Sequence, residues 1–141
     1  MTKDITIKIK GKQTYPGGEC VETVTEAAGE YYMRNGNHYV MYEEQEAGFT
    51  QSSKCMLKVY AQGVELTKKG LLQSKMVFEE GKQHMTEYRT PFGVFMLEVQ
   101  TGRVSVLEEE NSLTVRLEYS LGNNEEPMAD CDITITVMSK E

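Results

Sequence analysis

The chain has 141 residues, of which 39% are hydrophobic and 26% charged, and a formal net charge of −7. This length predicts one domain, residues 1–141, and the composition is typical of a soluble globular protein rather than a disordered polyelectrolyte. The negative charge argues against nucleic-acid binding, because neutralisation of phosphates drives nonspecific affinity. No run approaches the ~18 apolar residues of a membrane-spanning helix, and Lys3, Asp4 and Lys8 interrupt the region where a signal peptide would be apolar. We expect no membrane association and a cytoplasmic location.

Apolar and polar residues alternate along much of the chain, which predicts strands with one buried and one solvated face. The clearest alternating runs are residues 5–9, 55–59, 104–108, 113–121 and 133–137. Residues 19–33 contain Ala27-Ala28 and could form a short helix, but the Tyr31-Tyr32 pair favours a strand bent at Gly29.

Turn signals separate these runs at near-regular intervals of about ten residues, the spacing of one strand and one tight turn. The strongest is Asn35-Gly36, which predicts a type I′ hairpin because both central residues of that turn need a positive φ. Successive short strands pair with their neighbours, and an open sheet of this size would expose two edges. We therefore predict an all-β fold, an up-and-down antiparallel meander barrel of about 8–10 strands, with a β-sandwich as the second choice.

The residue types that carry metal or thiol chemistry are few and scattered. Cys20, Cys55 and Cys131 form no Cys-x-x-Cys pair, which predicts reduced thiols rather than a disulfide framework. His38 and His84 each follow a turn signal, so we expect both to be partly exposed and neither to bind a metal. No catalytic motif is present, and we expect neither a cofactor nor enzymatic activity.

The most unusual segment is residues 88–93, where Pro91 ends or bulges a strand and Gly93 permits conformations closed to other residues. Such a corner could present Arg89 and Phe92 at the mouth of a barrel, or could simply close the barrel.

The methionines leave a second question open. Flexible thioethers either line an adaptable apolar cavity or fill an irregular core, and this choice concerns Met41, Met56, Met76, Met85 and Met96.

Several fragments resemble the DUF1934 or YwiB-like family of small bacterial proteins. They are Tyr42-Glu43-Glu44, Met76-Val77-Phe78-Glu79-Glu80-Gly81, Tyr88-Arg89-Thr90-Pro91-Phe92-Gly93, Thr101 and Leu117-Glu118-Tyr119-Ser120-Leu121. The chain departs from the family at Lys68-Lys69-Gly70, where the family prefers Arg-x-Gly. The resemblance implies a calycin-like β-barrel, related in shape to lipocalins and fatty-acid-binding proteins, and supplies no activity or functional residues.

Two functions remain open, with a hydrolase or isomerase as a third that no residue pattern selects. The first is a binding module that holds a small apolar or amphipathic ligand. Its candidate residues at the barrel mouth or interior are Tyr42, Phe78, Tyr88, Arg89, Phe92 and Tyr119. The second is a structural or protein-interaction domain that forms a homodimer or binds a partner through an outer strand face. Segments that are apolar on both faces, residues 94–99 and 39–42, favour it, because something must cover the outer face.

Overall fold

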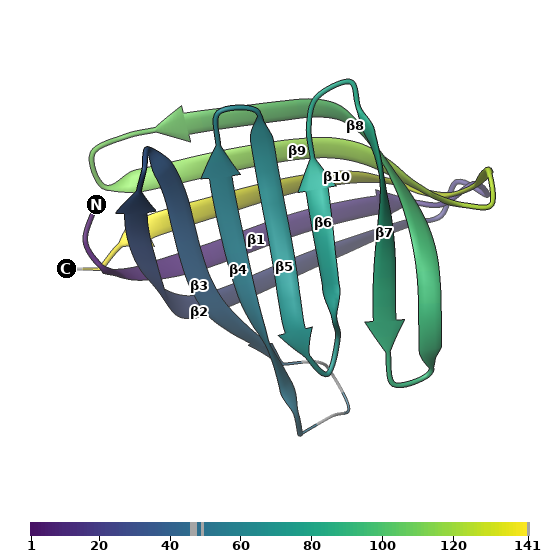
Figure 1. The fold of residues 1–141 in the computed structure, drawn as a ribbon, viewed down its shortest axis with the longest axis horizontal. Helices are drawn as coiled ribbons and strands as arrows, with labels where there is room; N and C mark the ends of the chain where they lie inside the picture. The colour runs from purple at the N-terminus through teal and green to yellow at the C-terminus, as the bar shows by residue number, and fades with distance from the viewer. Residues whose placement is uncertain (46–47, 49, 141) are drawn as a thin grey trace.

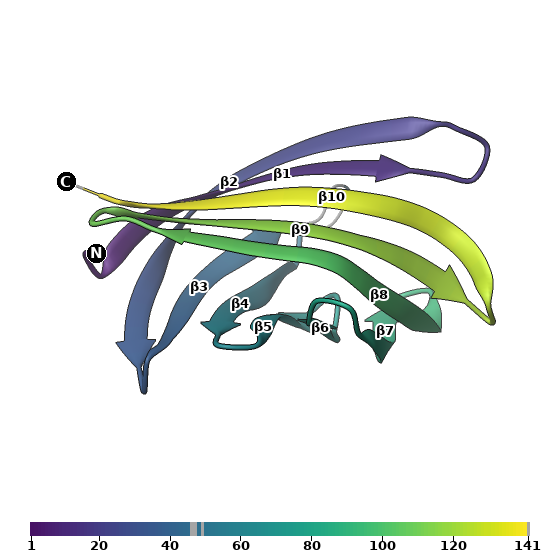
Figure 2. The same ribbon diagram turned by 90° about the horizontal axis from the view of Figure 1, so that it is seen from above.

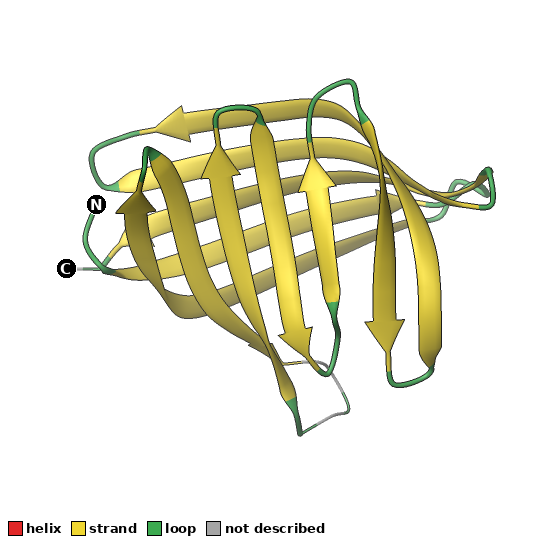
Figure 3. Cartoon of the chain, in the orientation of Figure 1, coloured by secondary structure: helices red, strands yellow, loops and turns green. Residues whose placement is uncertain are grey.

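The structure is a computed structural model that describes residues 1–45, 48 and 50–140. These residues form ten strands and no helix (Figure 3). The strands are β1 (Asp4–Thr14), β2 (Cys20–Arg34), β3 (Asn37–Gln45), β4 (Ser52–Tyr60), β5 (Gly63–Gly70), β6 (Ser74–Phe78), β7 (Gln83–Thr90), β8 (Gly93–Glu108), β9 (Ser112–Asn123) and β10 (Glu126–Ser139). The all-β prediction is confirmed.

The strands form one antiparallel sheet in the order β6-β5-β4-β3-β2-β1-β10-β9-β8-β7. Every pair except β1–β10 joins strands that follow one another in the chain, which confirms the up-and-down meander. The first and last strands pair along residues 5–14, so the two edges of the sheet are β6 and β7. These edges meet at one backbone bridge between Gln73 and Arg89, and the Thr86 hydroxyl donates to the carbonyl of Lys75 at 3.2 Å. The barrel is therefore nearly closed, with a seam between β6 and β7.

Two layers of strands cross each other with the core between them (Figures 1 and 2). One layer holds β1, β9, β10 and the first part of β2, and the other holds β3 to β7. β2 passes from one layer to the other near Gly29, where its pairing changes from β1 to β3. β8 also bends, and its register with β9 shifts between Thr101 and Arg103. The bent strand predicted for residues 19–33 is confirmed, and the helical alternative is wrong.

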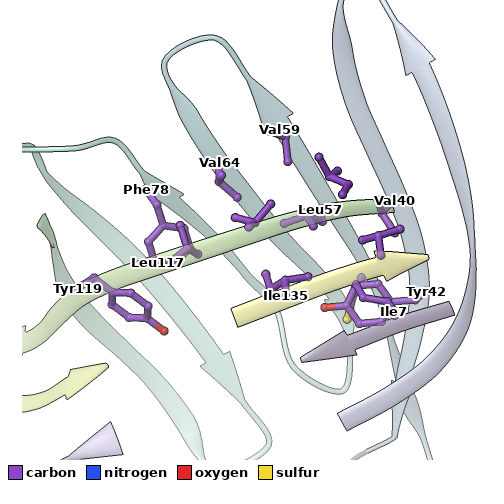
Figure 4. Packing of buried hydrophobic residues seen from close by; sticks show 14 of the residues in the cluster. Ile7, Val40, Tyr42, Leu57, Val59, Val64, Phe78, Leu117, Tyr119 and Ile135 are labelled. Atoms are coloured by element: carbon purple, nitrogen blue, oxygen red, sulfur yellow. The ribbon is translucent and has the colours of Figure 1, made fainter. Parts of the chain in front are cut away.

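The inward side chains of both layers fill the middle of the barrel. Ile7, Val40, Leu57, Leu117 and Ile135 are buried and lie between the layers (Figure 4). Each such side chain contributes about 1.5–3 kcal/mol by leaving water. Burial of this single core is what holds the two layers together.

The barrel has two different ends. Both termini lie at one end, together with the turns β2–β3, β4–β5, β6–β7 and β8–β9 (Figure 1); we call it the terminal end. The turns β1–β2, β5–β6, β7–β8 and β9–β10 lie at the other, which we call the open end. The β2–β3 turn has φ values of 53° at Asn35 and 79° at Gly36, which confirms the predicted hairpin.

Two expectations about side chains need correction. His38 is 6% exposed rather than partly exposed, because its ring faces inward and lies between Tyr31 and Glu108. His84 is partly exposed, as predicted. Met41, Met85 and Met96 neither line the barrel interior nor fill the core, since all three lie on the outer face and are 44–57% exposed. Met76 does pack against the core.

Gly29 gives a test of the bend in β2. A Cβ atom at this position would lie 2.4 Å from the carbonyl oxygen of Met41 and 3.3 Å from Cβ of Tyr42. We expect Gly29→Ala to lower the free energy of unfolding by about 1–3 kcal/mol, since the backbone must shift to admit the methyl group. Denaturant unfolding would measure this. The control is Gly17→Ala in an open turn, where nothing lies within 4 Å; equal stability of the two variants would contradict the prediction.

Candidate functional site

Solvent reaches the interior of the barrel at its open end. The inward row of β1 is buried at Ile5 and Ile7, but the same row becomes partly exposed at Gln13 near the open end. The inward row of β8 behaves alike: Val99 is fully buried, whereas Phe95 is 47% exposed. Side-chain direction is constant along each of these rows, so the inward side chains themselves become accessible to solvent toward this end.

An ion pair lies on the inner face near this end. Lys68 of β5 faces inward because it stands opposite the buried Cys55, and its Nζ lies 3.0 Å from Oε1 of Glu44. Burial alone would lower the pKa of Lys68, but the nearby Glu44 carboxylate outweighs it and raises the pKa. The ammonium group therefore stays charged within a largely apolar barrel, where an unpaired charge would be very costly.

Two tyrosines of the inner face, Tyr42 and Tyr88, lie near this ion pair, and a third, Tyr119, lies near Tyr88. Tyr42 is buried and its hydroxyl makes no hydrogen bond of good geometry, although the Cys55 thiol lies beside it; burial first, and then this neighbour, raise its pKa. Burial likewise raises the pKa of Tyr119, whose ring centroid lies 4.6 Å from that of Phe78 (Figure 4). Tyr88 is partly exposed and lies close enough to Lys68 and Tyr119 to influence the pKa of both.

Four of the six residues that the sequence singled out face the interior of the barrel. Tyr42, Phe78, Tyr88 and Tyr119 all point into the barrel. Arg89 alternates with Tyr88 and points outward, where its Nη2 lies 2.7 Å from Oε1 of Glu87. Phe92 lies in the β7–β8 turn at the rim of the open end and is 83% exposed. A binding role for these six residues stays a prediction.

Sequence reasoning missed Lys68 and Glu44. The signal that could have found them is the same two-residue period that located the strands. Glu44 follows Tyr42 by two residues and Lys68 follows Leu66 by two, so each shares the inward face of its strand. A charged residue in a strand is normally assigned to the solvated face, which is why they were overlooked.

The terminal end is closed by a second polar cluster. Tyr31 Oη lies 2.6 Å from Nδ1 of His38, whose Nε2 contacts Oε1 of Glu108. These residues come from β2, β3 and the end of β8, so the cluster fastens one layer to the other. Burial, followed by the Glu108 charge, raises the pKa of Tyr31.

A third polar cluster spans the seam between β6 and β7. The Tyr60 hydroxyl donates to Oε2 of Glu79 at 3.1 Å, and Nε2 of His84 lies 2.9 Å from Oε1 of the same carboxylate. Burial acts to raise the pKa of Glu79, but the hydrogen bonds from His84 and Tyr60 outweigh it and lower the pKa. Burial, then the bond to Glu79, raises the pKa of Tyr60 to about 12. The cluster thus ties the end of β6 to β7 and β4.

A hollow of about 620 Å³ lies on the outer face of β2, β3, β4 and β5. Ala28, Met41 and Met56 contribute its apolar side chains. Glu30 and Glu43 line it on β2 and β3, and Lys54 and Lys69 line it on β4 and β5. We call these seven residues the methionine face. This confirms that segment 39–42 is apolar on its outer as well as its inner face.

The described residues were compared with the requirements of a metal site and of a membrane-spanning helix. Within residues 1–45, 48 and 50–140, no group of three His, Cys, Asp or Glu side chains is placed to hold a metal ion. The same residues contain no helix with the length and apolar character needed to cross a bilayer.

Comparison with known proteins identifies the family. Residues 7–135 match the model of a domain of unknown function, DUF1934. The chain belongs to the DUF1934 family. Its fold matches the crystal structure of the ywiB protein from Bacillus subtilis with a TM-score of 0.88, over 99% of this chain and 93% of that one, at 19% sequence identity. No curated protein matches the sequence. The resemblance seen in the sequence is therefore confirmed, and with it a nearly closed, calycin-like barrel.

The seam cluster gives a pH-dependent prediction. Folding raises the pKa of Tyr60 from 10.0 to about 12, so its contribution to stability is complete below pH 10 and is lost as the pH rises toward 12. We expect Glu79→Gln to lower the pKa of Tyr60 toward 10.0 without reaching it, because burial remains. Tyrosinate absorbance, compared with that of Tyr60→Phe, would measure the shift. Glu87→Gln, at an exposed carboxylate bonded to Arg89, should leave the pKa of Tyr60 unchanged; an unchanged value in Glu79→Gln would contradict the prediction.

Proposed function

We propose that this DUF1934 chain is a non-enzymatic binding module that takes up a small, mainly apolar or amphipathic molecule through the open end of its barrel. The observation that supports this most directly is the Lys68–Glu44 ion pair on the inner face. A buried pair of this kind gains little stability over a packed apolar pair, because desolvation offsets the attraction between the charges. Its place beside solvent-accessible aromatic rings suits recognition better than stability.

The inner face at the open end offers a ligand two kinds of contact. Phe95 and Tyr88, cross-strand partners on β8 and β7, present partly exposed rings to an apolar body. An ammonium group has three donors, and Lys68 directs one of them to Glu44. A polar group of the ligand could accept another, with the Tyr88 hydroxyl nearby. A few polar anchors within an apolar surround are typical of small-molecule sites.

The two histidines of the chain are engaged in holding the barrel together. His38 contacts Tyr31 and Glu108 at the terminal end, and His84 binds Glu79 across the seam. Catalysis by either would require breaking a contact that joins separate strands. This favours a binding role over an acid–base enzyme. We further propose a cytoplasmic location, in keeping with three cysteines that form no disulfide.

Native mass spectrometry of protein purified from its host tests the proposal. We expect a small molecule to be retained, and expect the double variant Glu44→Gln/Lys68→Met to lose it while remaining folded, because removing both charges leaves none unpaired. The matched control is Glu43→Gln/Lys69→Met, which changes the neighbouring, outward residues of the same two strands. Retention of the molecule by the first variant, or a wild-type chain that carries nothing and binds no anionic fluorescent amphiphile, would contradict the proposal.

A second candidate function is interaction with another protein through the outer face of the barrel. The exposed methionines favour it, because methionine is adaptable and is frequent at binding surfaces. Met41 is 44% exposed, and its cross-strand partner on β4 is Met56. A homodimer and a different partner are both compatible with this candidate. A wild-type chain that remains monomeric and retains no protein when purified from its host would contradict it.

A further inference from the structure

The side chains of the methionine face, together with Thr67 beside Met56, form two rows that run across four strands. Cross-strand pairing sets Glu30, Met41, Met56 and Thr67 in one row. The next row toward the open end holds Ala28, Glu43, Lys54 and Lys69. The methionines of β3 and β4 are therefore direct neighbours at the centre of the face, and so are Glu43 and Lys54.

The charges on this face are separated by strand. Both carboxylates lie on β2 and β3, and both ammonium groups lie on β4 and β5. Among the residues that the structure describes, Glu43, Lys54 and Lys69 form no ion pair within the chain. Each half of the face is thus complementary in charge to the other half, with the boundary between β3 and β4.

We propose that the methionine face pairs with the same face of a second copy of this chain, across a two-fold axis that runs parallel to β3 and β4 and between them. The proposal rests on the second candidate function and names its partner. Such an axis exchanges the two halves of the face, so the acidic half of each copy lies over the basic half of the other. Isologous dimers of this kind are the commonest oligomers of soluble proteins.

The register follows from the symmetry. Because the axis runs along the strands, each row faces the same row of the other copy. Met41 then meets Met56 of the second copy, and Glu43 meets Lys54, with each contact made twice. Methionine has three rotatable bonds, so the four side chains can turn into the hollow that the two copies share. An axis perpendicular to the strands would instead set carboxylates over carboxylates.

Charge reversal tests this register. Glu43→Lys places two like-charged contacts in the homodimer, and so does Lys54→Glu, so each variant alone should dimerise at least about tenfold more weakly than the wild type. An equimolar mixture of the two variants restores both opposite-charge contacts, and we expect a heterodimer of near wild-type affinity. Sedimentation velocity over a concentration series would measure the dimerisation of each single variant and of their mixture, with a mass tag on one variant to identify the heterodimer.

Two controls keep a folding defect apart from a binding defect. Glu43 and Lys54 are also neighbours within one chain, so thermal unfolding of each variant should be recorded beside its sedimentation. The double variant Glu43→Lys/Lys54→Glu regains opposite charges both within and between chains, and should dimerise like the wild type.

Two results would overturn the proposal. A monomeric wild type at every accessible concentration excludes self-pairing, while leaving a different partner for the second candidate function. A dimer that neither single variant weakens excludes this register. In that case Met41→Asp tests whether the methionine face forms the dimer at all. Loss of the dimer would mean that the face is the interface in another register. An unchanged dimer would also remove the support for the second candidate function.

Discussion

The pairing of β1 with β10 is the contact on which the rest of the structure depends. The chain runs as two meanders, β1 to β6 and β7 to β10, and this pairing joins them into one sheet. It also sets Ile5, Ile7 and Ile9 beside Ser139, Val137 and Ile135, which places the ends of the chain at the centre of the sheet. The two edges that remain, β6 and β7, are adjacent in sequence, so a short turn already holds them close. A complete backbone ladder between them is therefore unnecessary, and a bridge and a polar cluster suffice.

Three polar clusters lie at the margins of the barrel, where backbone pairing between strands and apolar packing end. The Tyr31–His38–Glu108 cluster closes the terminal end, and the Tyr60–Glu79–His84 cluster crosses the seam. Both link strands that no backbone ladder joins, which accounts for them as structural contacts. The Lys68–Glu44 pair also joins strands without a direct ladder, β5 and β3, but both lie in one layer and both side chains face the interior near the open end. It joins neither the two layers nor the two edges of the seam, and this difference supports the binding role that we propose for the open end.

Much of the fold follows from the sequence because its information is local. The two-residue period located the strands, and Asn35-Gly36 located a hairpin whose backbone angles match. The bend in β2 was readable from Gly29, where a side chain would meet the backbone of β3. The position of the seam was not readable, since any two neighbouring strands could have been its edges. The site could be predicted in part. The inward tyrosines and Phe78 were predicted from the sequence, whereas Lys68 was missed because lysine in a strand usually points to solvent. The methionines misled for the opposite reason, being apolar residues on the outer face.

The same two strands carry both candidate surfaces. In β3, Tyr42 and Glu44 face the interior while Met41 and Glu43 face outward; in β4, Cys55 faces inward while Lys54 and Met56 face outward. Because the side-chain period of a strand is two, residues that differ by one position act on opposite faces. A substitution that alters the interior pair need not touch the methionine face, and the reverse holds as well. The two proposed functions are therefore separable by mutation, even though the same strands carry the residues of both.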